Sequence, residues 1–141
     1  MASLLERTRL ALGLTKKQAP NELKLADLVS RGLPAESVTR LIEQGIPDRD
    51  IFRTVIPRRT FQRRLASQAR LSPTESDRVE RFARILALAS LVLDGERRAV
   101  QWLSTKKRRF NDARPLDLLE SNTGTKLVED TLLQAYYGNV G

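Results

Sequence analysis

Four arginines within one short stretch are the residues of this chain best suited to binding a polyanion. Residues 56–65 read Ile-Pro-Arg-Arg-Thr-Phe-Gln-Arg-Arg-Leu, and at about 100° per residue they predict a helix with two unlike faces. Phe61 and Leu65 fall on an apolar side, whereas Arg59 and Arg63 fall on the opposite side. Guanidinium groups bind phosphates and guanine edges through paired N–H donors. The stretch indicates a helix that contacts DNA, although a solvated basic surface helix would show the same pattern.

The residues before this stretch predict how the basic helix is held. Pro57 suits the first helical position, where a missing N–H costs nothing. Ile46-Pro47-Asp48 opens a preceding short helix, so the order is helix, tight turn, basic helix, as in a helix-turn-helix. We expect Arg59 and Arg63 at base edges and Arg58 and Arg64 on phosphates. The full set of predicted DNA-contacting residues is Arg58, Arg59, Thr60, Gln62, Arg63 and Arg64.

Charge is divided unevenly along the 141 residues, whose formal net charge is +8. Residues 1–56 carry nine Lys/Arg against seven Asp/Glu, residues 57–114 carry fifteen against six, and residues 115–141 carry one against four. A basic middle followed by an acidic end favours a polyanionic partner for the middle and a different partner for the end. A general effect on solubility is the simpler alternative.

Glycines and capping residues predict an all-α chain. Apolar residues at helical spacing precede Gly32 and Gly45, which are placed as helix stops. Ser72-Pro73-Thr74-Glu75 is a capping box that should begin a long helix, which Asp94-Gly95 ends. Residues 82–93 are apolar at nearly every position. Such a helix is the core of a monomer or a homodimer interface, and we expect a dimer. The expected interface residues are Phe82, Leu86, Leu88, Ala89 and Leu93.

Several classes of function are excluded by composition. The chain has no cysteine and no histidine, which excludes disulfides, thiolate or imidazole catalysis and the usual zinc sites. No carboxylate pair or glycine-rich phosphate loop is present, so we expect neither an enzyme nor a cofactor. The longest apolar run is shorter than the ~20 residues that a membrane span needs. Residues 1–20 lack a signal-peptide core and predict a loosely attached leader helix.

The last third of the chain predicts three further helices and an exposed aromatic pair. Ala99, Trp102 and Leu103 indicate a short amphipathic helix, a second lies around 116–119, and a third runs from about Thr125 to Tyr137. The cations at 106–109 form a solvated loop, a phosphate-contacting edge or a socket for an acidic partner. Tyr136 and Tyr137 either complete the core or serve an interface, where tyrosine is enriched. A short tail at residues 138–141 is expected to be flexible.

Six separated segments of the chain occur in one order. They are Ile56-Pro57-Arg58-Arg59-Thr60; Leu71-Ser72-Pro73 with Glu75-Ser76-Asp77-Arg78; residues 81–89; Trp102-Leu103; Arg114-Pro115-Leu116-Asp117-Leu118-Leu119; and Gly124 through Val128-Glu129 to Tyr136-Tyr137-Gly138. In this order they resemble the Xre/MbcA/ParS family of toxin-binding antitoxins, and the resemblance covers roughly residues 22–138.

The resemblance implies an Xre-like helix-turn-helix DNA-binding domain, placed at 22–70, and a small helical toxin-binding domain, placed at 95–141. With the leader at 1–21 and the long dimerisation helix at 71–94, which the residue pattern predicts, the chain has four expected parts. It implies the antitoxin of a type II toxin–antitoxin system, whose partner is a RES-domain toxin that consumes NAD. Such a chain occludes the toxin and represses its own operon by binding double-stranded operator DNA. It would work in the bacterial cytoplasm, associated with the nucleoid when bound to its operator, and not at a membrane.

A RES-type pocket takes an anionic dinucleotide, so acidic residues near the carboxyl end of this chain would complement it. The expected toxin contacts are Trp102, Arg109, Asp117, Glu120, Glu129, Tyr136, Tyr137 and Gly138, and Asp130 is a further acidic candidate. Two other interpretations remain open: a helix-turn-helix transcriptional repressor with no toxin partner, and a helical adapter that does not bind DNA. The acidic, tyrosine-ended segment argues against the plain repressor, and the basic helix argues against the adapter.

Overall fold

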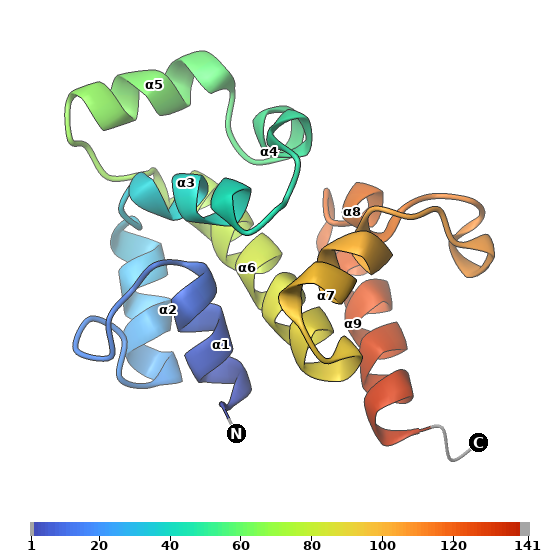
Figure 1. Ribbon diagram of the computed structural model, residues 1–141. Helices are drawn as coiled ribbons and strands as arrows, with labels where there is room; N and C mark the ends of the chain where they lie inside the picture. Colours follow the sequence, from blue (N-terminus) through green and yellow to red (C-terminus); the bar gives the residue numbers. More distant parts are fainter. Residues whose placement is uncertain (1, 139–141) are drawn as a thin grey trace. The chain divides into compact units, whose positions relative to one another are not determined.

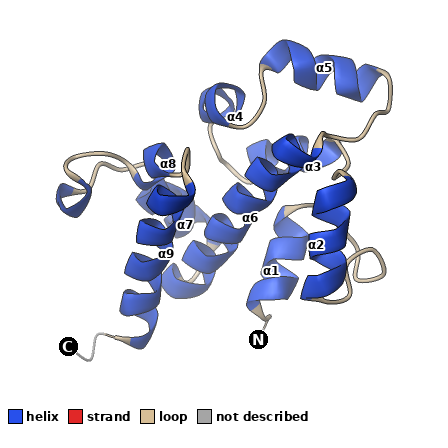
Figure 2. Cartoon of the chain, turned by 180° about the vertical axis from the view of Figure 1, so that it is seen from behind, coloured by secondary structure: helices blue, strands red, loops and turns tan. Residues whose placement is uncertain are grey.

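The computed structural model describes residues 2–138, which form helices joined by short connections (Figure 1). The described residues contain no β-strand (Figure 2), and two isolated backbone bridges, Pro34 with Arg70 and Lys107 with Ala113, are the only β-type pairings among them. The all-α prediction is confirmed. The chain divides into two compact units, Met1–Arg84 and Ile85–Gly141.

The first unit holds five helices and the beginning of a sixth. These are α1 (Leu4–Ala11), α2 (Glu22–Arg31), α3 (Glu36–Glu43), α4 (Asp48–Thr54), α5 (Arg58–Ala66) and the first part of α6 (Pro73–Leu93). Helices α1 and α2 lie side by side in both views, and α5 lies at the edge of this unit, beyond α3 and α4 (Figures 1 and 2). This placement leaves one side of α5 open to solvent.

The second unit begins with the remainder of α6. Its further elements are α7 (Glu96–Leu103), the short 3-10 helix η1 (Arg108–Phe110), α8 (Pro115–Leu118) and α9 (Asn122–Tyr137). Helix α8 packs against both α7 and α9. The buried side chains that hold these helices together include Leu103, Leu116, Leu119, Val128 and Leu132. Residues 139–141 of the predicted tail lie outside the described residues.

Helix boundaries follow the capping signals in the sequence. The Ser72 hydroxyl accepts from the Glu75 amide at 3.1 Å, and a Glu75 carboxylate oxygen accepts from the Ser72 amide at 2.8 Å, so the predicted capping box at the start of α6 is confirmed. Gly32 and Gly45 follow α2 and α3 with φ of +115° and +110°, which confirms both predicted stops. Gly32 is also a close approach, since a Cβ there would lie 2.4 Å from the Leu71 carbonyl oxygen.

The predicted loose attachment of the leader is wrong. Helix α1 packs against α3, and the segment that follows it buries Leu12, Leu14 and Ala19. The Ser37 hydroxyl donates to the Leu12 carbonyl at 2.7 Å, inside the unit. Leu12, Leu14 and Ala19 of the leader thus belong to the core of the helix-turn-helix unit, whereas Leu10 is exposed.

Candidate functional site

The helix-turn-helix is formed by α4, a three-residue turn and α5. Ile51 on α4 and Ile56 in the turn are fully buried, and the rings of Phe52 and Phe61 lie 5.7 Å apart with their planes 40° from parallel. These contacts fix the first half of α5 against α4. Pro57 stands immediately before the helix instead of at its first position, because α5 begins at Arg58.

The structure divides the four arginines of α5 into two pairs. Arg58 lies 3.6 Å from the Asp48 carboxylate and 4.2 Å from the centre of the Phe52 ring. Arg64 donates two hydrogen bonds to Glu75, at 2.9 and 3.1 Å. Within residues 2–138, neither an ion pair nor a side-chain hydrogen bond involves the guanidinium of Arg59 or Arg63, and both side chains are exposed.

The exposed face of α5 is therefore rich in uncompensated positive charge. Arg59 and Arg63 are four residues apart and so neighbours on one helix face, Gln62 beside them is exposed, and Thr60 is half-buried. The helix contains no acidic residue. We call Arg59, Thr60, Gln62 and Arg63 the recognition surface. Its free guanidinium groups can form bidentate contacts with guanine bases.

The ion pairs of Arg58 and Arg64 differ in how exposed they are to solvent. The pair of Arg58 with Asp48 is exposed on both sides, and such surface pairs contribute little, so Arg58 can exchange its partner for a phosphate. The Arg64 side chain is three-quarters buried and its guanidinium is held in a two-bond fork by Glu75. A phosphate contact by Arg64 would have to break this pair.

The apolar character of α6, on which the dimer prediction rested, is explained within one chain. Phe82, Leu86, Leu88 and Ala89 are all buried within the single chain, so their apolar character does not require a second copy. Sequence periodicity shows that a helix must be covered, but it does not show which chain covers it. Leu93, the fifth residue of the set, is half-exposed and lines a groove of the second unit.

This groove has a volume of about 840 Å³ and lies between α7, the loop around η1 and the last two turns of α9. Four of the predicted toxin contacts line it: Trp102, Arg109, Tyr137 and Gly138. Its other lining residues include Lys107, which belongs to the basic run at 106–109, together with Asp130 and Leu133. Leu133 was not predicted from the sequence. Leu133 could have been found because it lies four residues before Tyr137, on the same helix face.

The basic run at 106–109 is an ordered part of this site. The Lys107 amide donates to the Ala113 carbonyl at 3.0 Å, and Asn111 and Asp112 close the loop with φ of +57° and +66°. The Lys107 ammonium lies 5.1 Å from the centre of the Trp102 ring, a cation–π contact. Burial lowers the pKa of Lys107. Lys107 and Arg109 thus put positive charge on a groove whose walls are largely apolar.

The remaining predicted toxin contacts are spread over other parts of the unit. Asp117 pairs with Arg114 at 2.7 Å and accepts from its amide, which caps α8. Among the described residues, Glu120, Glu129 and Tyr136 do not line the groove. Tyr136 is 50% exposed and Tyr137 72% exposed, with their rings edge to face at 5.0 Å, so the tyrosines do not complete the core. An exposed aromatic pair of this kind is typical of an interface.

Within residues 2–138, no group of three or more His, Cys, Asp or Glu side chains is arranged to hold a metal ion. Over the same residues, every helix is too short or too polar to cross a membrane.

Comparison with known proteins matches both parts of the chain. Residues 24–84 match the Antitoxin Xre-like helix-turn-helix domain, and residues 87–138 match the Antitoxin Xre/MbcA/ParS C-terminal toxin-binding domain. The chain is 33% identical over 135 residues to Antitoxin Xre of Pseudomonas putida, covering 94% of this chain and 83% of that protein. The chain belongs to the Xre/MbcA/ParS antitoxin family. Antitoxin Xre of Yersinia enterocolitica is 31% identical over 117 residues, which cover 81% of this chain and 79% of that protein.

Family membership gives the two sites their context. The recognition surface of this Xre-family chain lies inside its helix-turn-helix domain, and the 840 Å³ groove lies inside its toxin-binding domain. Both domains occur in one chain, so DNA and a toxin are the partners that its domains suggest.

Proposed function

We propose that this chain is the antitoxin of a type II toxin–antitoxin system, which occludes a RES-domain toxin and represses its own operon. The observation that carries the proposal is the presence of both family domains in one chain, each with an exposed surface of matching chemistry. Its action on the toxin is steric, so the chain needs no catalytic residue or cofactor of its own. Its place would be the bacterial cytoplasm, and the nucleoid when it is bound to operator DNA.

For DNA, the proposal assigns base contacts to the recognition surface. Arg59 and Arg63 each present a free guanidinium that can bind guanine O6 and N7 in the major groove. Thr60 and Gln62 lie between them and can contact neighbouring base edges or phosphates. Arg58, at the start of the helix, is assigned to a phosphate. Because helix-turn-helix proteins usually bind two half-sites, we retain the homodimer as a proposal, on this ground and not on the apolar character of α6.

For the toxin, the proposal assigns the groove and the exposed tyrosine pair. Trp102, Leu133 and Tyr137 give apolar and aromatic surface, which supplies most of the binding energy of protein interfaces. Lys107 and Arg109 on one wall and Asp130 on the other give charges of both signs. Glu120 and Glu129 remain assigned to the positive rim of the toxin pocket. Their contacts would be weaker and more exposed to solvent than the contacts in the groove. Asp117 acts indirectly, by capping α8.

The test is co-expression with the RES-domain protein encoded beside this chain. Truncation after Thr123 would remove most of α9 together with the buried Val128 and Leu132, so it would unfold the unit instead of testing the surface. The variant Tyr136→Ala plus Tyr137→Ala changes exposed side chains only. We expect it to lose protection of the cells and of their NAD while staying folded.

Leu23→Ala is the matched control for the tyrosine variant. It removes an apolar side chain of similar exposure from the helix-turn-helix unit, and it should protect as well as the parent chain. Full protection by the tyrosine variant would assign neutralisation to another surface. If cells tolerate the neighbouring protein in the absence of this chain, that protein is not a toxin. The chain is then better interpreted as a helix-turn-helix repressor that has no toxin partner.

A further inference from the structure

The recognition helix has little apolar packing along its second half. Phe61, at 7% exposed, is the one buried residue of α5. It lies in the first half of the helix, as does Arg58, which contacts the Phe52 ring. In the second half, Leu65 is 37% exposed. Apolar contacts therefore fix where α5 begins but give little control over the direction in which it leaves the turn.

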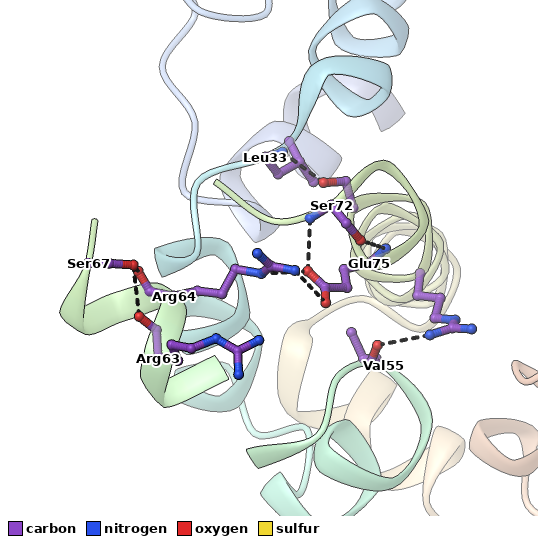
Figure 3. Close-up of polar contacts among 9 residues, drawn as sticks. Leu33, Val55, Arg63, Arg64, Ser67, Ser72 and Glu75 are labelled. Atoms are coloured by element: carbon purple, nitrogen blue, oxygen red, sulfur yellow. Dashed lines mark hydrogen bonds and ion pairs between the residues drawn. The ribbon is translucent and has the colours of Figure 1, made fainter. Parts of the chain in front are cut away.

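The second half of α5 is held by a polar contact to α6. The Arg64 Nε lies 2.9 Å from one Glu75 carboxylate oxygen and its Nη2 lies 3.1 Å from the other, so the contact is a bidentate fork (Figure 3). The two side chains are 25% and 13% exposed. A two-bond fork fixes direction as well as distance, which a single charge contact does not.

Glu75 is itself held rigidly. The carboxylate oxygen that binds the Arg64 Nε also accepts from the Ser72 amide at 2.8 Å, which closes the capping box of α6. The hydroxyl of the neighbouring Ser76 accepts a hydrogen bond from the Leu33 amide at 2.8 Å in the interior, drawn at Leu33 in Figure 3. The Leu71 amide donates to the Leu33 carbonyl at 2.9 Å. The partner of Arg64 therefore belongs to the fixed frame of the unit.

The charge state of Glu75 is consistent with this contact. Burial by itself would raise the pKa of the Glu75 carboxyl, but hydrogen bonds from Arg64 and from the Ser72 amide, with the charge of Arg64, outweigh burial and lower the pKa from its ordinary value. The carboxylate stays ionised at neutral pH, and the fork remains charged on both sides.

We propose that Arg64 is a positioning residue, which sets the orientation of the recognition helix through its fork to Glu75 and does not contact a DNA phosphate. The inference rests on the proposed binding of operator DNA by α5. It assigns Glu75, an acidic residue that DNA would repel, an indirect but favourable part in DNA binding. It also explains why one arginine of the four on a DNA-binding helix is mostly buried.

The two roles predict opposite results for the same substitutions. Glu75→Gln keeps a capping acceptor but removes the charge of the fork, and Arg64→Lys keeps the charge but removes the fork. If Arg64 positions the helix, each should raise the Kd for operator DNA roughly tenfold. If Arg64 binds a phosphate, Lys should replace it with little loss, and Glu75→Gln should leave binding unchanged or improve it.

The experiment is a fluorescence titration of full-length protein with a duplex taken from upstream of its own gene, at several salt concentrations. The matched controls are Arg58→Lys and Arg58→Ala on the same helix. Arg58→Ala should reduce the slope of log affinity against log salt by about 0.9, as loss of one phosphate contact does. Arg64→Ala should weaken binding at every salt concentration with the slope unchanged. All variants are compared below the midpoints of their thermal unfolding.

The double variant Arg64→Lys with Glu75→Gln should bind operator DNA no more weakly than either single variant, because each single substitution already removes the same Arg64–Glu75 contact. A reduced salt slope for Arg64→Ala, or wild-type affinity for Glu75→Gln, would overturn the positioning role while leaving DNA binding by α5 in place. If the parent protein itself does not bind the duplex more tightly than an unrelated one, the proposed repressor function fails instead.

Discussion

Removing both free arginines of the recognition surface should abolish specific DNA binding and leave the fold intact. The perturbation is Arg59→Ala together with Arg63→Ala. Each bidentate guanine contact contributes about 1–3 kcal/mol, so losing two should raise the Kd for operator DNA roughly 30-fold to 10⁴-fold. Neither side chain is buried or paired within the described part of the chain, and alanine favours helix at least as well as arginine. The free energy of unfolding should change by less than about 0.5 kcal/mol.

The assay compares the affinity of each variant for the upstream duplex with its affinity for a duplex of unrelated sequence. Because any loss of positive charge weakens binding to all DNA, the ratio of the two affinities is the informative quantity. Arg97→Ala with Arg98→Ala is the matched control, since it removes the same two charges from exposed positions of α7. The control should keep the ratio of the parent chain. An unchanged ratio in the Arg59 and Arg63 variant would refute the assignment of base contacts to α5.

Three further predictions concern stability. Gly124→Ala places a Cβ 2.1 Å from the Leu118 carbonyl oxygen, so it should destabilise the second unit by about 1–3 kcal/mol, measured by thermal unfolding. The Glu75–Arg64 pair stabilises the chain fully at pH values above the ordinary carboxyl pKa, and this stabilisation is lost as the pH falls through the lowered pKa of Glu75. The difference in unfolding free energy between the parent chain and Glu75→Gln should therefore shrink on acidification. Asp117→Ala should cost about 0.5–2 kcal/mol by uncapping α8, and a normal melting curve would contradict this role.

Local signals made the helix positions predictable. The capping box at Ser72 and Glu75 and the glycines at 32 and 45 act through contacts within a few residues, so they can be recognised without the tertiary structure. The helix predicted from about Thr125 begins about three residues earlier, at Asn122, and glycine disfavours a helix interior, so Gly124 gives no helical signal. In the structure the Ser121 hydroxyl caps the Gly124 amide at 2.9 Å, and only glycine fits against the Leu118 carbonyl.

Site roles that depend on distant partners could not be predicted. The sequence predicted a phosphate contact for Arg64, but its partner Glu75 lies eleven residues away on another helix. The leader was wrongly expected to be loose because the burial of Leu12 depends on α3. The groove of the toxin-binding domain combines residues from α7, the η1 loop and α9, so its four predicted members could be named one by one but not as one surface.

Neutralisation of the toxin can be measured as NAD consumption by the purified neighbouring RES-domain protein while this chain is added. We expect consumption to stop when the chain reaches the stoichiometry of the complex, the Leu23→Ala control to behave identically, and Tyr136→Ala with Tyr137→Ala to require a large excess. Undiminished NAD consumption at saturating concentrations of the folded parent chain would show that this chain does not neutralise the toxin.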